Sequence, residues 1–181
     1  MEIKKGFFNF VIVIFFLSLL SRSLDAIPSP YRMKKDASLI NEACKKSGDV
    51  DLCLSILKGY SGKITIEGLS IFVFEYGIKK AKETINLVNK LGTNTTDKVL
   101  KVCFEGCAVD YGRFIDHCNE AINAVKESDY SDAKTDLDWA LEAKSSCEDC
   151  FSEFQPPRKS PIINENKFNT RILFIAGNIL P

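Results

Sequence analysis

The chain has 181 residues, and its 24 Lys and Arg balance its 24 Asp and Glu, so the formal net charge is zero. This balance leaves no basic footprint for nucleic-acid binding, and the length suits one domain with a hydrophobic core of its own. Seven cysteines against a single histidine make cysteine chemistry the first question that the sequence raises.

The N-terminus has the three parts of a secretory signal peptide. Two lysines precede an apolar run at 7–20, and the small and polar stretch SRSLDA follows. This order predicts a signal peptide over 1–26, with cleavage after Ala26 or, alternatively, after Ser23. An uncleaved membrane anchor is the alternative, but the run has about fourteen residues and a spanning helix needs about 20. We therefore expect a secreted domain over 27–181, with no membrane association after cleavage.

Beyond the signal peptide, apolar residues recur at steps of three and four, which predicts helices throughout. Two short helices come first and form a hairpin over about 35–60, which is too small to have its own core. Longer stripes follow, separated by turn residues and by the proline-interrupted loop QPPRKSP. The predicted helices cover 35–47, 50–58, 64–91, 99–127, 131–153 and a last segment with its stripe at 168–179.

The long stripes define the fold class. The clearest one steps by three or four without exception through Leu100, Cys103, Cys107, Tyr111, Phe114, Cys118, Ala121 and Val125. Four amphipathic helices joined by short loops make an up-down bundle, here over about 64–181. The sequence therefore predicts an all-α protein, an up-down four-helix bundle with an N-terminal helical hairpin, stapled by disulfides.

The cysteines lie inside the apolar stripes and therefore face the core. In an oxidising secretory compartment such cysteines pair. Their spacing also permits a zinc site, which the oxidising compartment disfavours. The single histidine, His117, is interpreted as a helix residue near the surface rather than as a ligand or catalyst. We expect no metal and no cofactor.

Antiparallel packing suggests which cysteines meet. If a short turn at about 128–130 joins two neighbouring helices, facing residues have a nearly constant index sum. Cys107 with Cys147 sums to 254, and Cys103 with Cys150 sums to 253, so both pairs can lie opposite each other. The pair Cys103–Cys150 is a hypothesis built on this helix register.

The other three cysteines have simpler readings. Cys44 and Cys53 bracket the turn of the hairpin, and a disulfide between them would close it for roughly 2.5–3 kcal/mol. Cys118 has no partner at its level of the bundle and is expected to be a buried free thiol. Several other pairings remain formally open, because sequence does not fix connectivity.

Four motifs follow one another along the mature chain. The first two are the cysteine pair in NEACKKSGDVDLC at 41–53 and CAVDY at 107–111. The third is DYSDAKTDLDWALEAKSSCEDCF at 129–151, and the fourth is an apolar helix after the proline-rich loop. In this order they resemble the plant invertase and pectin methylesterase inhibitor domain, and the third looks like that family's run ending in A-L-x5-C-x-D-x-F. The resemblance covers the mature chain from about Leu39 to its end.

This resemblance implies a function and agrees with the fold predicted above. Members of the family are non-enzymatic proteins of the plant cell wall and, for some, of the vacuole. They inhibit pectin methylesterase or acid invertase in one-to-one complexes. Their two shared disulfides correspond to Cys44–Cys53 and Cys107–Cys147, while Cys103 and Cys150 depart from that minimal pattern. The resemblance thus implies an apoplastic enzyme inhibitor, with the vacuole less favoured.

The same resemblance bears on the target enzyme. Invertase-directed members carry Pro-Lys-Phe between the second and third bundle helices, whereas this chain has SDY at 128–130. This favours pectin methylesterase over acid invertase. Members directed at pectin methylesterase present acids along the same two helices. Asp116 and Glu142 fall at such positions, while Val109 and Arg113 depart from the pattern.

Two kinds of candidate site follow. Asp116, Asp136 and Glu142 lie off the apolar stripes and are the candidate target-binding residues, with a solvated helix face as the alternative interpretation. Asn94 begins the sequon Asn-Thr-Thr on a predicted exposed loop and is the candidate glycosylation site, with an unused sequon as the alternative.

Other functional classes are alternatives to enzyme inhibition. A secreted carrier of apolar ligands needs an empty apolar cavity, but bulky stripe residues are expected to fill this bundle: Phe104, Tyr111, Phe114, Trp139 and Phe151. An inactive structural relative is a further alternative. Catalytic activity is not expected, because the sequence has no nucleophile–base pair with histidine and no glycine-rich phosphate loop.

Overall fold

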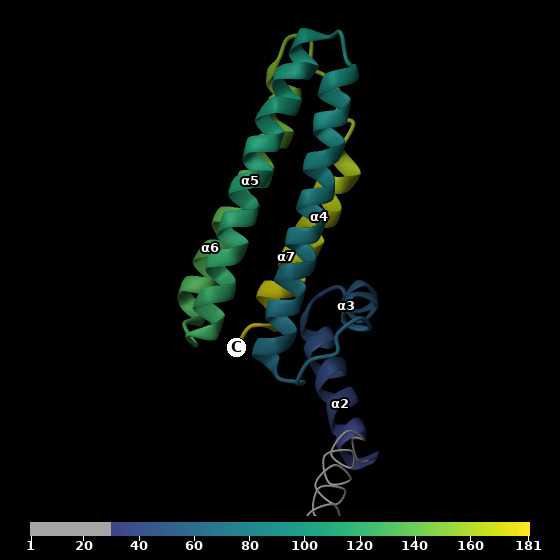
Figure 1. Cartoon of the computed structure of the whole chain (residues 1–181), viewed down its shortest axis with the longest axis vertical. Helices are drawn as coiled ribbons and strands as arrows, with labels where there is room; N and C mark the ends of the chain where they lie inside the picture. The colour runs from purple at the N-terminus through teal and green to yellow at the C-terminus, as the bar shows by residue number, and fades with distance from the viewer. Residues whose placement is uncertain (1–29) are drawn as a thin grey trace, which may run out of the picture. The chain divides into compact units, whose positions relative to one another are not determined.

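The computed structural model describes residues 30–181, so the predicted signal peptide at 1–26 lies outside the described residues (Figure 1). Contacts divide the chain into two units, 1–38 and 39–181, and the bundle belongs to the second. Between residues 30 and 181 the structure contains helices and no strand, which confirms the all-α prediction. In the same range no helix is both long enough and apolar enough to span a membrane.

The described part has six helices, and most of their ends fall within a few residues of the prediction. Two differences stand out. The last helix begins at Ile163, well before its apolar stripe, and the first begins at Pro30 rather than at 35. The helices are α2 (Pro30–Lys46), α3 (Val50–Leu57), α4 (Ile66–Asn94), α5 (Lys98–Lys126), α6 (Tyr130–Glu153) and α7 (Ile163–Ile179).

Within residues 39–181, α4 to α7 run alternately up and down and lie side by side (Figure 1). Helix α4 packs on α5 and α7, and α6 packs on α5 and α7, which closes a four-helix bundle. The short α3 contacts α4 and α7. The apolar stripes turn toward the bundle axis, where burial of apolar surface stabilises the fold. The largest fully buried side chains include Phe74, Tyr111, Phe114 and Phe151.

Side-chain caps set the beginnings of the long helices. The Thr65 hydroxyl accepts from the Gly68 N–H at the start of α4, and the Asp97 carboxylate accepts from two backbone N–H groups at the start of α5. At the start of α6, Asp129 accepts from the Asp132 N–H at 3.0 Å. Such caps satisfy amide groups that have no partner inside the helix. The preceding turn needs a left-handed residue, and Ser128 supplies it with φ of 63°.

The structure contains three disulfides, and they are the three pairs that the sequence analysis expected. One joins the end of α2 to α3, and two join α5 to α6. The Cα–Cα distances are 5.4 Å for Cys44–Cys53, 4.5 Å for Cys107–Cys147 and 5.5 Å for Cys103–Cys150. Cys118 is a free buried cysteine, and burial raises the pKa of its thiol. The helix register inferred from the index sums therefore holds in the structure.

A buried polar network links α7 to α4 and α5, and the sequence analysis did not anticipate it. The Tyr111 hydroxyl donates to Asn166 Oδ1 at 2.6 Å. Asn169 Nδ2 lies 3.3 Å from both Thr84 Oγ1 and the Tyr111 hydroxyl, and 2.9 Å from the Glu165 carbonyl oxygen. Burial raises the pKa of Tyr111. Buried polar groups of this kind are costly unless paired, so the network fixes how α7 lies in the bundle.

Candidate functional site

The three candidate target-binding acids lie on α5 and α6 but in different surroundings. Asp116 and Glu142 are exposed, as expected of groups that reach a partner. The Asp136 side chain is 19% exposed and lies 3.2 Å from His117 Nδ1 on the neighbouring helix. Asp116 is about 100° around the α5 axis from His117, so it faces solvent rather than this contact. The structure brings Asp136 and Glu142 to the α5–α6 interface and leaves Asp116 on the outer face of α5.

A shallow groove of about 170 Å³ lies between α5 and α6. We call it the α5–α6 groove. Trp139 is 51% exposed, and its ring stacks on the His117 imidazole with 6.3 Å between ring centroids. Side chains of both charge signs surround this aromatic pair. The groove is lined by Arg113, His117, Trp139, Glu142, Ala143 and Ser146.

Trp139 corrects one expectation from the sequence. It was counted among the bulky residues that fill the core, yet half of it is exposed to solvent. The buried stripe of α6 runs through Leu137, Ala140 and Cys147, and Trp139 falls outside these steps. Helix periodicity alone places it at the flank of α6. The position of Trp139 off the apolar stripe of α6 was therefore the signal in the sequence that predicts its exposure.

Charges around the groove are partly paired. Arg113 Nη1 lies 3.3 Å from Asp110 Oδ1, and burial raises the pKa of the Asp110 carboxyl despite this neighbour. His117 Nδ1 lies 3.5 Å from Glu120 Oε2 as well as close to Asp136. His117 is 30% exposed, in line with its interpretation as a residue near the surface. An exposed tryptophan beside mixed charges can receive a protein partner, since aromatic anchors with polar rims dominate interfaces.

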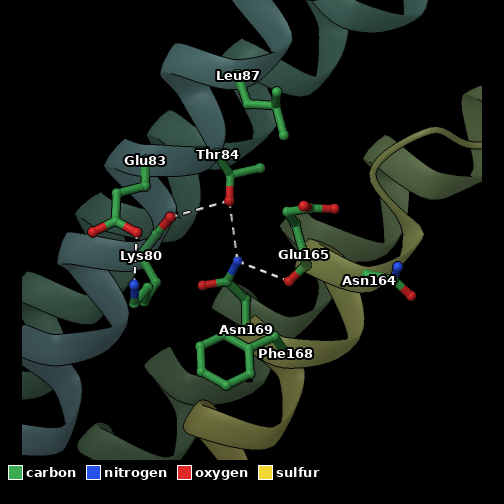
Figure 2. A pocket seen from close by; sticks show the side chains of 8 residues that line it. All are labelled: Lys80, Glu83, Thr84, Leu87, Asn164, Glu165, Phe168 and Asn169. Atoms are coloured by element: carbon green, nitrogen blue, oxygen red, sulfur yellow. Dashed lines mark hydrogen bonds and ion pairs between the residues drawn. The ribbon is translucent and has the colours of Figure 1, made fainter.

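A second hollow, between α4 and α7, tests the carrier hypothesis (Figure 2). It has a volume of about 440 Å³, and six of its eight lining residues are polar or charged. Figure 2 shows Lys80 beside Glu83 on α4, with Asn169 on α7 reaching Thr84. The hollow is open to solvent, and aromatic side chains fill the bundle core, so the described residues enclose no empty apolar cavity there. The hollow therefore gives no support to a carrier function.

The sequon at Asn94 lies at the C-terminal end of α4. Asn94 and Thr96 are exposed, and Thr95 is partly buried. The α4 cap ends here, with the Thr95 N–H donating to the Leu91 carbonyl oxygen at 3.0 Å. A glycan on Asn94 would meet solvent without displacing a packed side chain. Glycosylation at this position stays a prediction.

Comparisons with known proteins bear on the identity of the chain. A pectinesterase inhibitor from Actinidia deliciosa is 28% identical over 181 residues, which cover 97% of this chain and 93% of the relative. A crystal structure of a mutant pectin methylesterase inhibitor from Arabidopsis matches with a TM-score of 0.63 and 20% identity, covering 76% of this chain and 94% of that chain. A second one, from Arabidopsis thaliana, matches with a TM-score of 0.58 and 20% identity, covering 81% and 98%.

The two crystal structures share the fold described above. The sequence match goes further, because a model of the family "Plant invertase/pectin methylesterase inhibitor" matches residues 38–180. This match includes all six paired cysteines and the whole of the bundle. The chain therefore belongs to the plant invertase and pectin methylesterase inhibitor family.

Proposed function

We propose that this protein is a secreted, non-enzymatic inhibitor of pectin methylesterase that binds its target one-to-one. Membership of an inhibitor family supports a protein partner over a catalytic role. The observation that carries the choice of target is that the relative and both solved structures compared above are named pectinesterase or pectin methylesterase inhibitors. The extracellular cell wall is the compartment where such an inhibitor meets its target.

The α5–α6 turn is consistent with this choice of target. It reads SDY at 128–130, and invertase-directed members carry Pro-Lys-Phe there. Here the turn is tight, because Ser128 is left-handed and Asp129 caps α6. The Tyr130 hydroxyl donates to Glu67 Oε1 on α4 at 3.0 Å, which ties the turn to the bundle. Tyr130 thus serves the fold and is not free to act as a recognition group.

The α5–α6 groove is the proposed contact surface. Trp139 supplies a large aromatic group at low conformational-entropy cost, as expected of an energetic anchor at an interface. Val109 adds an exposed apolar side chain on the outer face of α5, at 57% exposure. Asp116 and Glu142 form an acidic rim that attracts basic groups of a partner. Such rim charges act mainly on the association rate, while the anchor acts on affinity.

Two enzyme assays test the proposed function. The mature chain from residue 27, folded with its disulfides, is added to purified pectin methylesterase and to purified acid invertase. We expect saturable inhibition of methanol release by the first enzyme at a one-to-one ratio, and no effect on sucrose hydrolysis by the second. Inhibition of invertase alone would overturn the choice of target. Inhibition of neither enzyme would overturn the proposed function.

A matched pair of variants tests the proposed surface. Trp139→Ala removes the anchor, and we expect it to weaken inhibition of pectin methylesterase at least tenfold, or about 1.4 kcal/mol. Phe174→Ala is the control, because Phe174 on α7 is 52% exposed and Trp139 is 51% exposed. Equal losses in the two variants would place the contact surface elsewhere. Thermal unfolding of both variants shows whether either change acts through the fold.

Glycosylation of Asn94 belongs to the same proposal. The sequon lies at the α4–α5 end of the bundle, and Trp139 lies in the middle of α6. A glycan there leaves the α5–α6 groove open. Peptide mass spectrometry of protein secreted by plant cells is expected to find the Asn94 peptide modified. Enzymatic removal of the glycan is expected to leave inhibition unchanged, and an unmodified peptide would contradict this part of the proposal.

A further inference from the structure

Three side chains converge at one edge of the α5–α6 groove. His117 and Glu120 come from successive turns of α5, and Asp136 comes from α6. His117 Nδ1 lies 3.2 Å from Asp136 Oδ1 and 3.5 Å from Glu120 Oε2, and one ligand atom from each residue lies within 4.8 Å of the others. The sequence pattern does not predict this cluster, because Asp136 comes from a different helix than His117 and Glu120.

A single hydrogen on His117 Nδ1 cannot bond to both carboxylates at once. Nδ1 of His117 carries at most one hydrogen, so it donates to one carboxylate oxygen at a time. Both Asp136 and Glu120 nevertheless direct an oxygen to the same nitrogen. A cation among the three atoms would contact all of them at once. The two negative charges would also be neutralised by one divalent ion.

The spacing of the donor atoms fits a particular class of cation. In a tetrahedral zinc site with bonds of about 2.0–2.2 Å, ligand atoms lie about 3.3–3.6 Å apart. The distances from His117 Nδ1 to the two carboxylate oxygens are close to this range, and the two oxygens lie within 4.8 Å of each other, a spacing that a small movement of the Glu120 side chain can shorten. Calcium prefers six to eight oxygen ligands at longer distances, and magnesium favours oxygen and water. An imidazole with two carboxylates suits zinc and its neighbours in the first transition series.

The surroundings hold two of the three groups in place. The His117 side chain is 30% exposed, so packing restricts it, and the Trp139 ring lies nearly parallel to its imidazole with 6.3 Å between ring centroids. Asp136 is 19% exposed, so packing restricts its side chain. Glu120 is 64% exposed and can adjust to the ion. Fixed donors with one adjustable ligand lower the ordering cost of binding a metal.

We propose that His117, Glu120 and Asp136 bind a divalent transition metal ion, with zinc as the preferred ion. The three residues supply three ligands of a tetrahedral site, and the fourth position stays open to water or to a side chain of a bound protein. The site adjoins the α5–α6 groove, since His117 lines both. This inference revises the sequence interpretation of His117 as a plain surface residue.

A titration of the untagged mature chain tests the proposal without any target enzyme. Trp139 is the chain's single tryptophan and stacks on the ligating imidazole, so its fluorescence reports binding. Isothermal titration calorimetry with zinc is expected to give one site per chain. Cobalt(II) is expected to give the visible absorption of a tetrahedral site with nitrogen and oxygen ligands. A thiolate charge-transfer band would instead assign the metal to Cys118 and overturn the proposal.

Substitutions identify the ligands. Glu120→Gln changes an exposed side chain and keeps the fold, and Asp136→Asn changes the half-buried one. Each is expected to weaken zinc binding at least tenfold, and His117→Gln is expected to abolish it. Asp138→Asn is the matched control, because Asp138 is an exposed acid on α6 outside the cluster. Absence of saturable zinc binding would show that the cluster is an ion pair alone, and equal zinc affinity in Glu120→Gln and wild type would show that these three residues do not form the zinc site.

Discussion

Two helix pairs of the same bundle are held together by different means. Helices α5 and α6 are joined by a three-residue turn and by two disulfides, Cys107–Cys147 and Cys103–Cys150. Helices α4 and α7 are distant in sequence, and their contact includes the hydrogen bond between Thr84 and Asn169 (Figure 2). The first contact includes covalent bonds, and the second includes a buried hydrogen-bond network as well as apolar packing.

The two kinds of contact act on different states of the chain: the disulfides on the unfolded state, and the hydrogen bonds on the folded state. A disulfide stabilises mainly by restricting the unfolded chain, so it works even where native packing is imperfect. A buried amide stabilises only where its partners are correctly placed, because an unpaired one costs about 1–3 kcal/mol. Disulfides can thus align two helices that follow each other in the sequence. A helix that returns from far along the chain needs contacts that penalise a wrong register.

Removing both α5–α6 disulfides is expected to give the largest effect. With Cys107–Cys147 intact, the loop that Cys103–Cys150 closes is only about eight residues, so replacing 103 and 150 by alanine costs about 2.5 kcal/mol. Replacing all four cysteines also releases a loop of 40 residues, for about 6 kcal/mol in total. The double loss therefore exceeds the sum of the two single losses.

Guanidinium chloride unfolding measures these losses in three variants, with alanine at 103 and 150, at 107 and 147, or at all four positions. Cys118→Ala is the control, because it removes a buried sulfur and leaves every bridge in place. Strict additivity of the two single losses would show that the bridges act independently of each other. The loop-closure account would then be wrong for this pair of helices.

The polar contact of α7 is expected to be weaker but specific. Tyr111→Phe removes the hydroxyl that donates to Asn166 Oδ1 and accepts from Asn169 Nδ2. Because buried amide groups then lose a partner, we expect a loss of about 2 kcal/mol in the free energy of unfolding. Tyr31→Phe removes the same atom from a residue that is 81% exposed and is expected to change nothing measurable. A loss below about 0.5 kcal/mol for Tyr111→Phe would mean that the network does not hold α7.

The two helix pairs are also expected to differ in recognition. Reversing charge at Asp116 and Glu142 on α5 and α6 is expected to weaken inhibition of pectin methylesterase about tenfold, or about 1.4 kcal/mol. The change in unfolding free energy is expected to stay within about 0.5 kcal/mol, because both side chains are exposed. Reversing Glu75 and Glu83 on α4 gives the same change in net charge. Equal losses from the two double variants would indicate long-range charge rather than contact.

The smallest expected effect concerns the turn that joins α5 to α6. Ser128 has φ of 63°, a left-handed conformation that costs a residue with a side chain about 1–2 kcal/mol. Glycine adopts it freely but loses more conformational entropy on folding. Ser128→Gly is therefore expected to raise the unfolding free energy by about 0.5 kcal/mol, as measured by denaturant titration. A decrease would show that serine contacts outweigh the strain.

The same contrast explains which parts of the fold could be predicted from sequence. Periodicity gave the helices, and the short α5–α6 turn let the cysteine index sums give the register of Cys103 and Cys150. No such rule relates Thr84 to Asn169, because 85 positions in the sequence separate these two contacting residues. Asn166 and Asn169 did carry a signal, since they extend the buried steps of α7 through Leu173.

The candidate site was less predictable than the fold. Helix periodicity correctly predicted that Asp116 and Glu142 are exposed. It did not predict which side chains of neighbouring helices contact each other. Asp136 meets His117 because α5 and α6 pack side by side, and single-helix periodicity carries no such information. Trp139 was missed because hydrophobic residues were read as core by type rather than by position. Surface chemistry depends on pairs of helices, which a pattern along one helix does not describe.

The buried thiol of Cys118 has a consequence for how the disulfides form during folding. Any of the seven cysteines could be left over, and the other six pair in 15 ways, so oxidation of the unfolded chain offers many wrong products. A free thiol can repair such errors by exchange, because its thiolate attacks other bridges. Once the core closes, burial and the nearby Asp136 carboxylate raise the pKa of Cys118 and suppress that thiolate. Native packing thus protects the correct bridges from exchange with the remaining thiol of the described residues.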